Sequence, residues 1–213
     1  MLFFAVKRND RRADPPPEQL RNGTRRGRLL VISGPSGAGK GTLIGRVLPH
    51  LPNTFLSRSA TTRPRRPEER QGREYYFLSP QEFEDRAKKG EFLEHVKYGS
   101  SSYGTLKSVV EDDLAAGRNV ILEIELEGAR NVRRLLPEAA LIFIAPPDFA
   151  ELESRLRGRS TEAEEEVAAR LERAREELAS RNEFDYIIVN QTVDQAAAEL
   201  EKVIKTELEG GSS

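Results

Sequence analysis

A glycine-rich stretch at residues 34–42, Gly-Pro-Ser-Gly-Ala-Gly-Lys-Gly-Thr, constrains the fold of this chain more than any other segment. The apolar run 29–32 before it indicates a buried strand, and 43–48 after it has the pattern of a helix start. Glycines let the backbone curl so that its N–H groups point inward, and the helix N-terminus adds partial positive charge. The stretch therefore predicts a concave site for a phosphate chain, with Lys40 reaching the β and γ oxygens.

The alternative interpretation of this stretch is a glycine-rich turn with a solvated lysine, and the flanking strand and helix disfavour it. One position departs from the usual motif. Gly41 follows Lys40 where a hydroxyl side chain that contacts Mg²⁺ is usual, and Thr42 comes one residue later. We therefore expect no protein ligand for a metal, and we expect Mg²⁺ to be held mainly by phosphates and water.

Further apolar runs at 120–124, 141–145 and 186–189 alternate with segments of helical pattern. Such runs indicate parallel strands that are covered on both faces. We predict an α/β fold of the P-loop NTPase type, with three layers around a central parallel sheet. The residues that predict helix starts by capping are Ser79, Asp148, Thr161 and Thr192. A further helix is expected from Thr105 to Gly117.

The middle of the chain, about 58–104, has many polar residues and lacks long apolar runs. We interpret it as a mixed α/β lobe inserted between core segments 28–57 and 105–208. Residues 1–27 contain three consecutive prolines and many arginines, which predicts a flexible basic arm. Residues 209–213 form a short tail.

Composition excludes several classes of function. The chain has 213 residues, enough for one core and a smaller lobe, and its net charge of −1 gives no general attraction to nucleic acid or membrane. No apolar run approaches the ~20 residues of a membrane span. The absence of cysteine and the presence of only two histidines argue against a thiolate or histidine metal site. We expect a cytoplasmic protein, and the sequence leaves its oligomeric state undetermined.

Side chains of the middle lobe suit a nucleotide. Arginine and tyrosine groups suit a phosphate, because they donate hydrogen bonds to its oxygens. A carboxylate beside hydroxyls suits guanine, which has an amine donor and O6 as acceptor, whereas it would face adenine's ring nitrogen without a donor. The residues of these types are Ser59, Arg63, Arg66, Glu69, Tyr75, Glu94, Tyr103 and Thr105.

Five motifs together resemble those of guanylate kinases, in the same order and at the same spacing. They occupy 59–66, 91–94, 103–105, 122–125 and 155–159, and the likeness extends from about Arg28 to Glu207. The resemblance implies reversible phosphoryl transfer from ATP to GMP, giving ADP and GDP, in the recycling of GMP in purine metabolism. ATP and GMP would be the partners, and Mg²⁺ the cofactor.

The resemblance also implies roles by position. Residues matching GMP-binding positions are Ser59, Arg63, Arg66, Glu69, Tyr75, Glu94, Tyr103, Thr105 and Glu123. Of these, Arg63, Arg66, Tyr75 and Tyr103 would hold the phosphate, and Glu94, Ser59 and Thr105 would read guanine. The ATP-binding residues would be Gly34, Pro35, Ser36, Gly37, Ala38, Gly39, Lys40, Gly41, Thr42 and Asn190. The catalytic residues would be Lys40, Arg66, Arg155, Arg159 and Arg170, the last three in or beside a mobile helical lid at about 157–170.

Some positions depart from the family pattern, above all Glu125, which stands where an aspartate is usual. Simpler interpretations also exist for single residues. Arg170 could pair with Glu166, Thr105 could be a helix N-cap, and Glu123, within an apolar strand, would be a buried carboxylate in need of partners. For the whole chain, the alternatives are a catalytically inactive guanylate-kinase-like binding module and a kinase for another nucleoside monophosphate. The presence of Lys40 and the lid arginines favours an enzyme.

Overall fold

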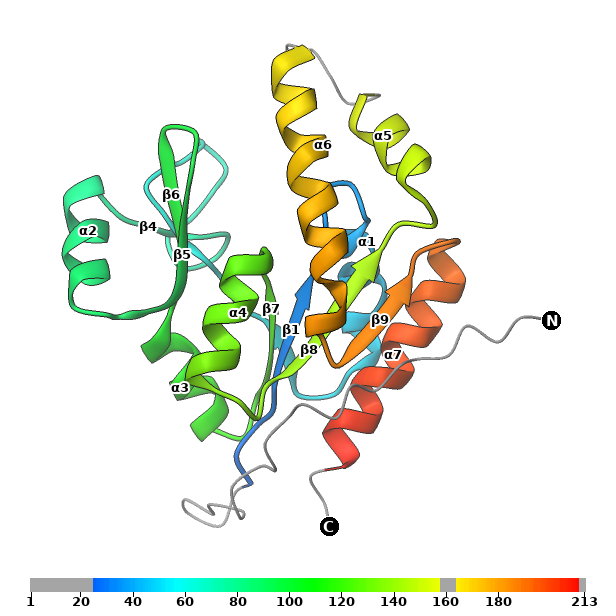
Figure 1. Cartoon of the computed structure of the whole chain (residues 1–213). Coiled ribbons are helices and arrows are strands. Elements are labelled where there is room, and N and C mark those ends of the chain that lie inside the picture. The colour runs from blue at the N-terminus through cyan, green and yellow to red at the C-terminus, as the bar shows by residue number, and fades with distance from the viewer. Residues whose placement is uncertain (1–24, 158–163, 211–213) are drawn as a thin grey trace.

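The computed structural model describes residues 25–157 and 164–210, and its centre is a parallel five-stranded sheet (Figure 1). The strand order is β2-β7-β1-β8-β9, and every neighbouring pair is parallel. The strands are β1 (Leu29–Ser33), β2 (Thr54–Leu56), β7 (Asn119–Glu123), β8 (Ala140–Ala145) and β9 (Tyr186–Val189). The central parallel sheet predicted from the apolar runs is confirmed.

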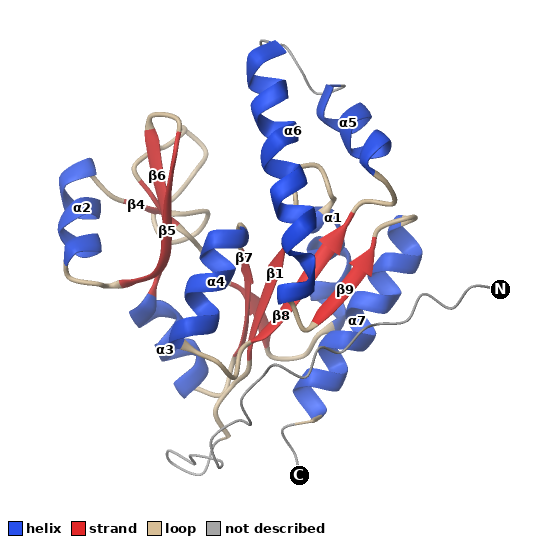
Figure 2. Ribbon diagram, in the orientation of Figure 1, coloured by secondary structure: helices blue, strands red, loops and turns tan. Residues whose placement is uncertain are grey.

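Helices cover both faces of this sheet and complete three layers (Figure 2). One face packs against α1 (Lys40–Val47) and α7 (Val193–Glu209), through side chains such as Ile32 and Leu200 that are fully buried. The other face packs against α3 (Lys107–Ala115) and α4 (Leu126–Leu135). Alternate residues of each strand therefore enter two separate cores, as expected for a buried parallel sheet.

A second, mixed sheet lies beside the central one and has the order β4-β3-β6-β5. Its strands are β3 (Ala60–Thr61), β4 (Tyr76–Phe77), β5 (Phe92–Tyr98) and β6 (Ser101–Leu106). The helix α2 (Pro80–Lys88) begins with the predicted capping box at Ser79 and stacks Phe83 on Phe92, with ring centroids 4.5 Å apart. A bulge between Phe92 and Glu94 interrupts the pairing of β5 with β6.

Two helices, α5 (Phe149–Arg157) and α6 (Glu164–Ala179), pack together at the carboxyl ends of the central strands, and α6 continues down beside the sheet, where Leu178 packs against the core that α3 and α4 cover (Figure 1). Short 3₁₀ turns, η1 (Leu48–His50) and η2 (Ser180–Glu183), follow α1 and α6. The predicted caps at Asp148 and Thr192 are confirmed, since each accepts a backbone N–H three residues later. The predicted cap at Thr161 lies outside the described residues.

The helix expected from Thr105 begins later, at Lys107. Residues 101–106 form β6, because antiparallel pairing with β5 continues as far as Leu106. The helical pattern from Leu106 onward could not reveal this boundary, since strand pairing is a contact between distant segments. Within the described part of the chain, no helix is both long and apolar enough to cross a membrane.

Candidate functional site

The glycine-rich loop joins β1 to α1 and has the conformation that its sequence requires. Gly34, Gly37 and Gly39 have φ values of 142°, 86° and 92°, where a side chain would be strained. A Cβ at Gly39 would also overlap the amide nitrogen of Asn190, which donates to the carbonyl of Ala38 at 2.8 Å. Because Gly39 is the N-cap of α1 and carries no side chain, the first N–H groups of the helix remain for an anion.

Lys40 lies at the start of α1 and points back over the loop. Its Nζ donates to the carbonyl oxygens of Gly34 at 2.6 Å and Pro35 at 3.2 Å. Burial lowers the pKa of Lys40, while the carboxylates of Glu123, Glu177 and Glu125 act in the opposite direction. The ammonium group is therefore held beside the loop in a site that both desolvates it and surrounds it with negative charge.

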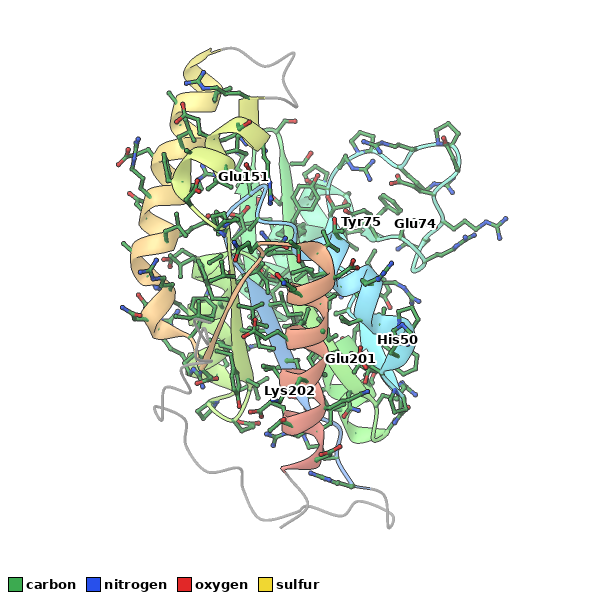
Figure 3. The ribbon with its side chains drawn as sticks, turned by 90° about the vertical axis from the view of Figure 1, so that its right-hand side faces the viewer. His50, Glu74, Tyr75, Glu151, Glu201 and Lys202 are labelled. Atoms are coloured by element: carbon green, nitrogen blue, oxygen red, sulfur yellow. The ribbon has the colours of Figure 1, made fainter. Side chains whose placement is uncertain are left out.

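A cavity of about 770 Å³ extends from the loop to the second sheet. The predicted site residues that line it are Ser36, Lys40, Ser59, Tyr75, Glu94, Tyr103, Glu123 and Arg170. They come from several regions that are distant in the sequence. In Figure 3, Tyr75 lies in the part of the chain that carries the second sheet, and Glu151 lies in α5, at a distance from it.

Glu94 lies in β5 of the second sheet and lines the cavity at the end formed by that sheet. It is only 7% exposed, and one of its oxygens, Oε1, accepts a hydrogen bond from the Thr105 hydroxyl at 2.7 Å. Burial raises the pKa of Glu94, against the effect of the Thr105 hydrogen bonds. Thr105 lies in β6, and the N-cap of α3 is Leu106, so the interpretation of Thr105 as a helix cap is wrong.

Aromatic and basic groups gather beside this end of the cavity. The rings of Tyr75 and Tyr103 meet edge to face with centroids 6.2 Å apart, and the Arg63 guanidinium lies 5.4 Å from the Tyr75 centroid. Arg63 is paired with Glu69 at 2.6 Å, and Glu69 also accepts the backbone N–H of Arg66 at 2.8 Å. This pairing lowers the pKa of Glu69. Arg63, Arg66 and Glu69 are not among the residues that line the cavity.

Two of the predicted lid arginines reach the glycine-rich loop. Arg170 of α6 donates to the Ser36 hydroxyl at 2.9 Å, and Arg155 of α5 approaches the carbonyl of Gly37 at 3.5 Å. Arg155 is also bound to Glu151 one turn earlier, at 3.0 Å. Arg159 lies outside the described residues.

One predicted residue has surroundings that differ from the expectation. Glu123 is exposed to the cavity and not buried, because it is the last residue of β7 and its carboxylate turns toward the start of α1. Both of its oxygens lie 3.6 Å from where a Cβ at Gly41 would be. Asn190 is buried, and its amide supports the loop through Ala38.

Sequence reasoning missed Arg173 and Glu177, which line the cavity on the same face of α6 as Arg170. Positions three and seven residues after Arg170 share its helix face, and this spacing was the available signal. Glu177 is 6% exposed, and burial raises its pKa to about 7, with Lys40 opposing the rise and Glu125 adding to it. Among the described residues, no group of three or more histidine, cysteine or acidic side chains is arranged to hold a metal ion.

The parallel sheet, the glycine turn between β1 and α1, and the lysine at the helix start define a P-loop protein that binds phosphate groups. Residues 26–207 match the family model described as "Guanylate kinase". The chain belongs to the guanylate kinase family, and the resemblance stated from the motifs is confirmed.

Relatives from several bacteria support this assignment. The guanylate kinase of Synechococcus sp. (strain CC9902) is 52% identical over 175 residues, covering 82% of this chain and 94% of the relative. That of Rubrobacter xylanophilus is 49% identical, covering 88% and 98%. The crystal structure of guanylate kinase from Anaplasma phagocytophilum is 29% identical with a TM-score of 0.68, covering 87% and 88%.

Proposed function

We propose that the chain transfers the terminal phosphoryl group of ATP to GMP, and that the cavity between the loop and Glu94 is where the two nucleotides meet. The observation that carries the proposal is the joining of a phosphate-binding loop and a buried carboxylate in one cavity. Each feature alone has other uses. Together they select a substrate with an anionic end and a base that donates hydrogen bonds.

The base would lie against Glu94. Its carboxylate accepts hydrogen bonds, which suits the amine and ring N–H groups of guanine. The Thr105 hydroxyl donates to the other side of the same carboxylate and holds its orientation. Adenine would turn an unprotonated ring nitrogen toward this buried carboxylate in place of the ring N–H of guanine, which is costly in a site with little water.

The phosphoryl group would move between the loop and the tyrosines. An oxygen of the GMP phosphate attacks the γ-phosphorus of ATP, and the bond from that phosphorus to the bridging oxygen of ADP breaks. The attacking oxygen is already anionic, so no strong general base is needed. Lys40, Arg155 and Arg170 would balance the charge at the loop. Tyr75, Tyr103, Arg63 and Arg66 would hold the GMP phosphate.

Mg²⁺ would be bound mainly by the phosphates of ATP and by water. The position after Lys40 is a glycine, and the nearby protein groups are the carboxylates of Glu123 and Glu125 on the cavity wall. Hard carboxylate oxygens fit the hydration shell of this ion. When bound, the ion would offset the charge of the phosphate chain.

A coupled assay of ADP release tests the proposal, with GMP, AMP, CMP and UMP each offered with ATP. We expect turnover with GMP and little with the others. Equal turnover with AMP would instead indicate a kinase of different specificity. No turnover with any monophosphate, in a chain that still binds GMP by calorimetry, would indicate a binding module.

A further inference from the structure

The carboxylate of Glu94 is held from two sides. Thr105 donates to Oε1, as described above. On the other side lies Gly128, a buried glycine in the first turn of α4, the helix between the two sheets (Figure 1). A Cβ built at Gly128 would lie 3.1 Å from Cγ of Glu94 and 3.2 Å from its Oε2. Ordinary contacts of a Cβ are 3.4–4 Å, so a methyl group here would require the Glu94 side chain to shift by a few tenths of an ångström.

Glu94 lines the cavity, so a displaced side chain would move into the space proposed for the base. Glu94 is almost fully buried, and movement away from Gly128 would strain the hydrogen bond to Thr105. The third neighbour of the same Cβ would be Cδ1 of Ile124, at 3.3 Å, which closes a further side. The space at Gly128 is therefore filled by the back of the Glu94 side chain.

The backbone of β5 sets the direction in which the Glu94 side chain points. The bulge between Phe92 and Glu94 sends Leu93 into the core beside α4 and leaves Glu94 paired with Thr105. Bulges turn side chains in this way beside functional sites. Pairing of β5 with β6 from Phe92 to Tyr98 limits any shift of the strand that could compensate for a displaced carboxylate.

We propose that Gly128 is a positioning residue for base selection: the missing side chain leaves the space in which the Glu94 carboxylate stands to accept the N–H groups of guanine. This inference rests on the proposed function, since it assigns to Glu94 the reading of the base. Gly128 would not itself contact the substrate, since it does not line the cavity. It acts through Glu94 alone.

Gly128→Ala tests the inference by steady-state kinetics with GMP and ATP varied in turn. We expect the KM for GMP to rise about tenfold, or about 1.4 kcal/mol, with the KM for ATP within about twofold of the parent. Gly45→Ala is the matched control, because Gly45 is also helical and, among the described residues, no atom beyond its chain neighbours and the backbone of its own helix lies within 4 Å of a Cβ there. It should leave both KM values unchanged.

A second variant separates positioning from a general effect on folding. Glu94→Asp shortens the side chain and withdraws it from Gly128. If the methyl group acts on the carboxylate, Gly128→Ala should change the KM for GMP less than about twofold when it is combined with Glu94→Asp. Equal effects with and without Glu94→Asp, or an unchanged KM in the single variant, would overturn the inference. A parent chain that fails to phosphorylate GMP would overturn the proposed function instead, so the two failures are distinguishable.

Discussion

The buried carboxyl group of Glu177 should make the stability of the fold depend on pH. Its pKa is raised from an ordinary 4.5 to about 7, chiefly by burial. Between these values the folded chain binds the proton that the unfolded chain has released. Stability therefore falls as pH rises from about 4.5 to 7, and the loss is complete above pH ~8.

The size of the effect follows from the two pKa values. Their difference, 7 − 4.5 = 2.5, corresponds to roughly 3.4 kcal/mol when fully developed, at about 1.36 kcal/mol for each unit of pKa. Part of this loss of stability has already occurred at mildly acidic pH, where the group is partly ionised in the unfolded chain. From about pH 5 to about pH 8.5, roughly 2.5 kcal/mol should be lost through this one group.

Urea unfolding of the parent and of Glu177→Gln at these two pH values measures the effect. Glutamine cannot ionise, so the variant should gain about 2.5 kcal/mol over the parent between the acid and the alkaline condition. Glu176→Gln changes the same net charge at an exposed position of α6 and serves as the control. If the variant and the parent lose stability in parallel as pH rises, the burial argument for Glu177 is refuted.

Three other predictions concern single side chains. Lys40→Met should lower kcat roughly a hundredfold or more in the ADP-release assay, because it removes charge from the migrating phosphoryl group; retention of kcat would contradict its role. The KM for GMP should rise as pH falls toward the raised pKa of Glu94, at a pH where an ordinary glutamate stays ionised, and Glu94→Gln should raise this KM strongly and leave only the pH dependence that comes from the phosphate of GMP. Asp185 pairs with Arg133 at 2.6 Å and accepts the Leu141 N–H at 2.8 Å, so Asp185→Ala should cost about 3–5 kcal/mol in urea unfolding, and a loss below ~1 kcal/mol would be inconsistent with a buried pair.

The central fold could be predicted from sequence because its signals are local. Residues 29–42 contain a buried strand, a glycine turn and a helix start in one continuous stretch, and each apolar run of the sheet is long enough to identify by itself. The family could be identified for a similar reason, since its motifs are short and ordered along the chain. Both predictions are confirmed by the sheet topology and by the family match.

Parts of the site were beyond sequence reasoning because they depend on contacts between distant segments. The end of β6 is set by its pairing with β5, so the start of α3 was misplaced. The exposure of Glu123 depends on where β7 ends relative to α1. Glu177 looks like an ordinary surface residue of an amphipathic helix, and only the packing of α6 over the loop buries it. The roles assigned to the site residues by resemblance remain predictions.

The three carboxylates near the loop, Glu123, Glu125 and Glu177, need a reason in a site for phosphates, which they repel. Burial alone would favour the neutral form of Lys40, and a neutral amine could not balance the charge of a phosphate chain. The carboxylates oppose this effect of burial on the pKa of Lys40, in a cavity that must exclude water during the transfer. The ionisation of Glu177 then has two opposite consequences. It lowers the stability of the fold, and its negative charge opposes the lowering of the Lys40 pKa by burial. We therefore expect Glu177→Gln to be more stable than the parent at alkaline pH and to have a lower pKa at Lys40, which an NMR titration of the lysine would measure; an unchanged Lys40 pKa would contradict this role of Glu177.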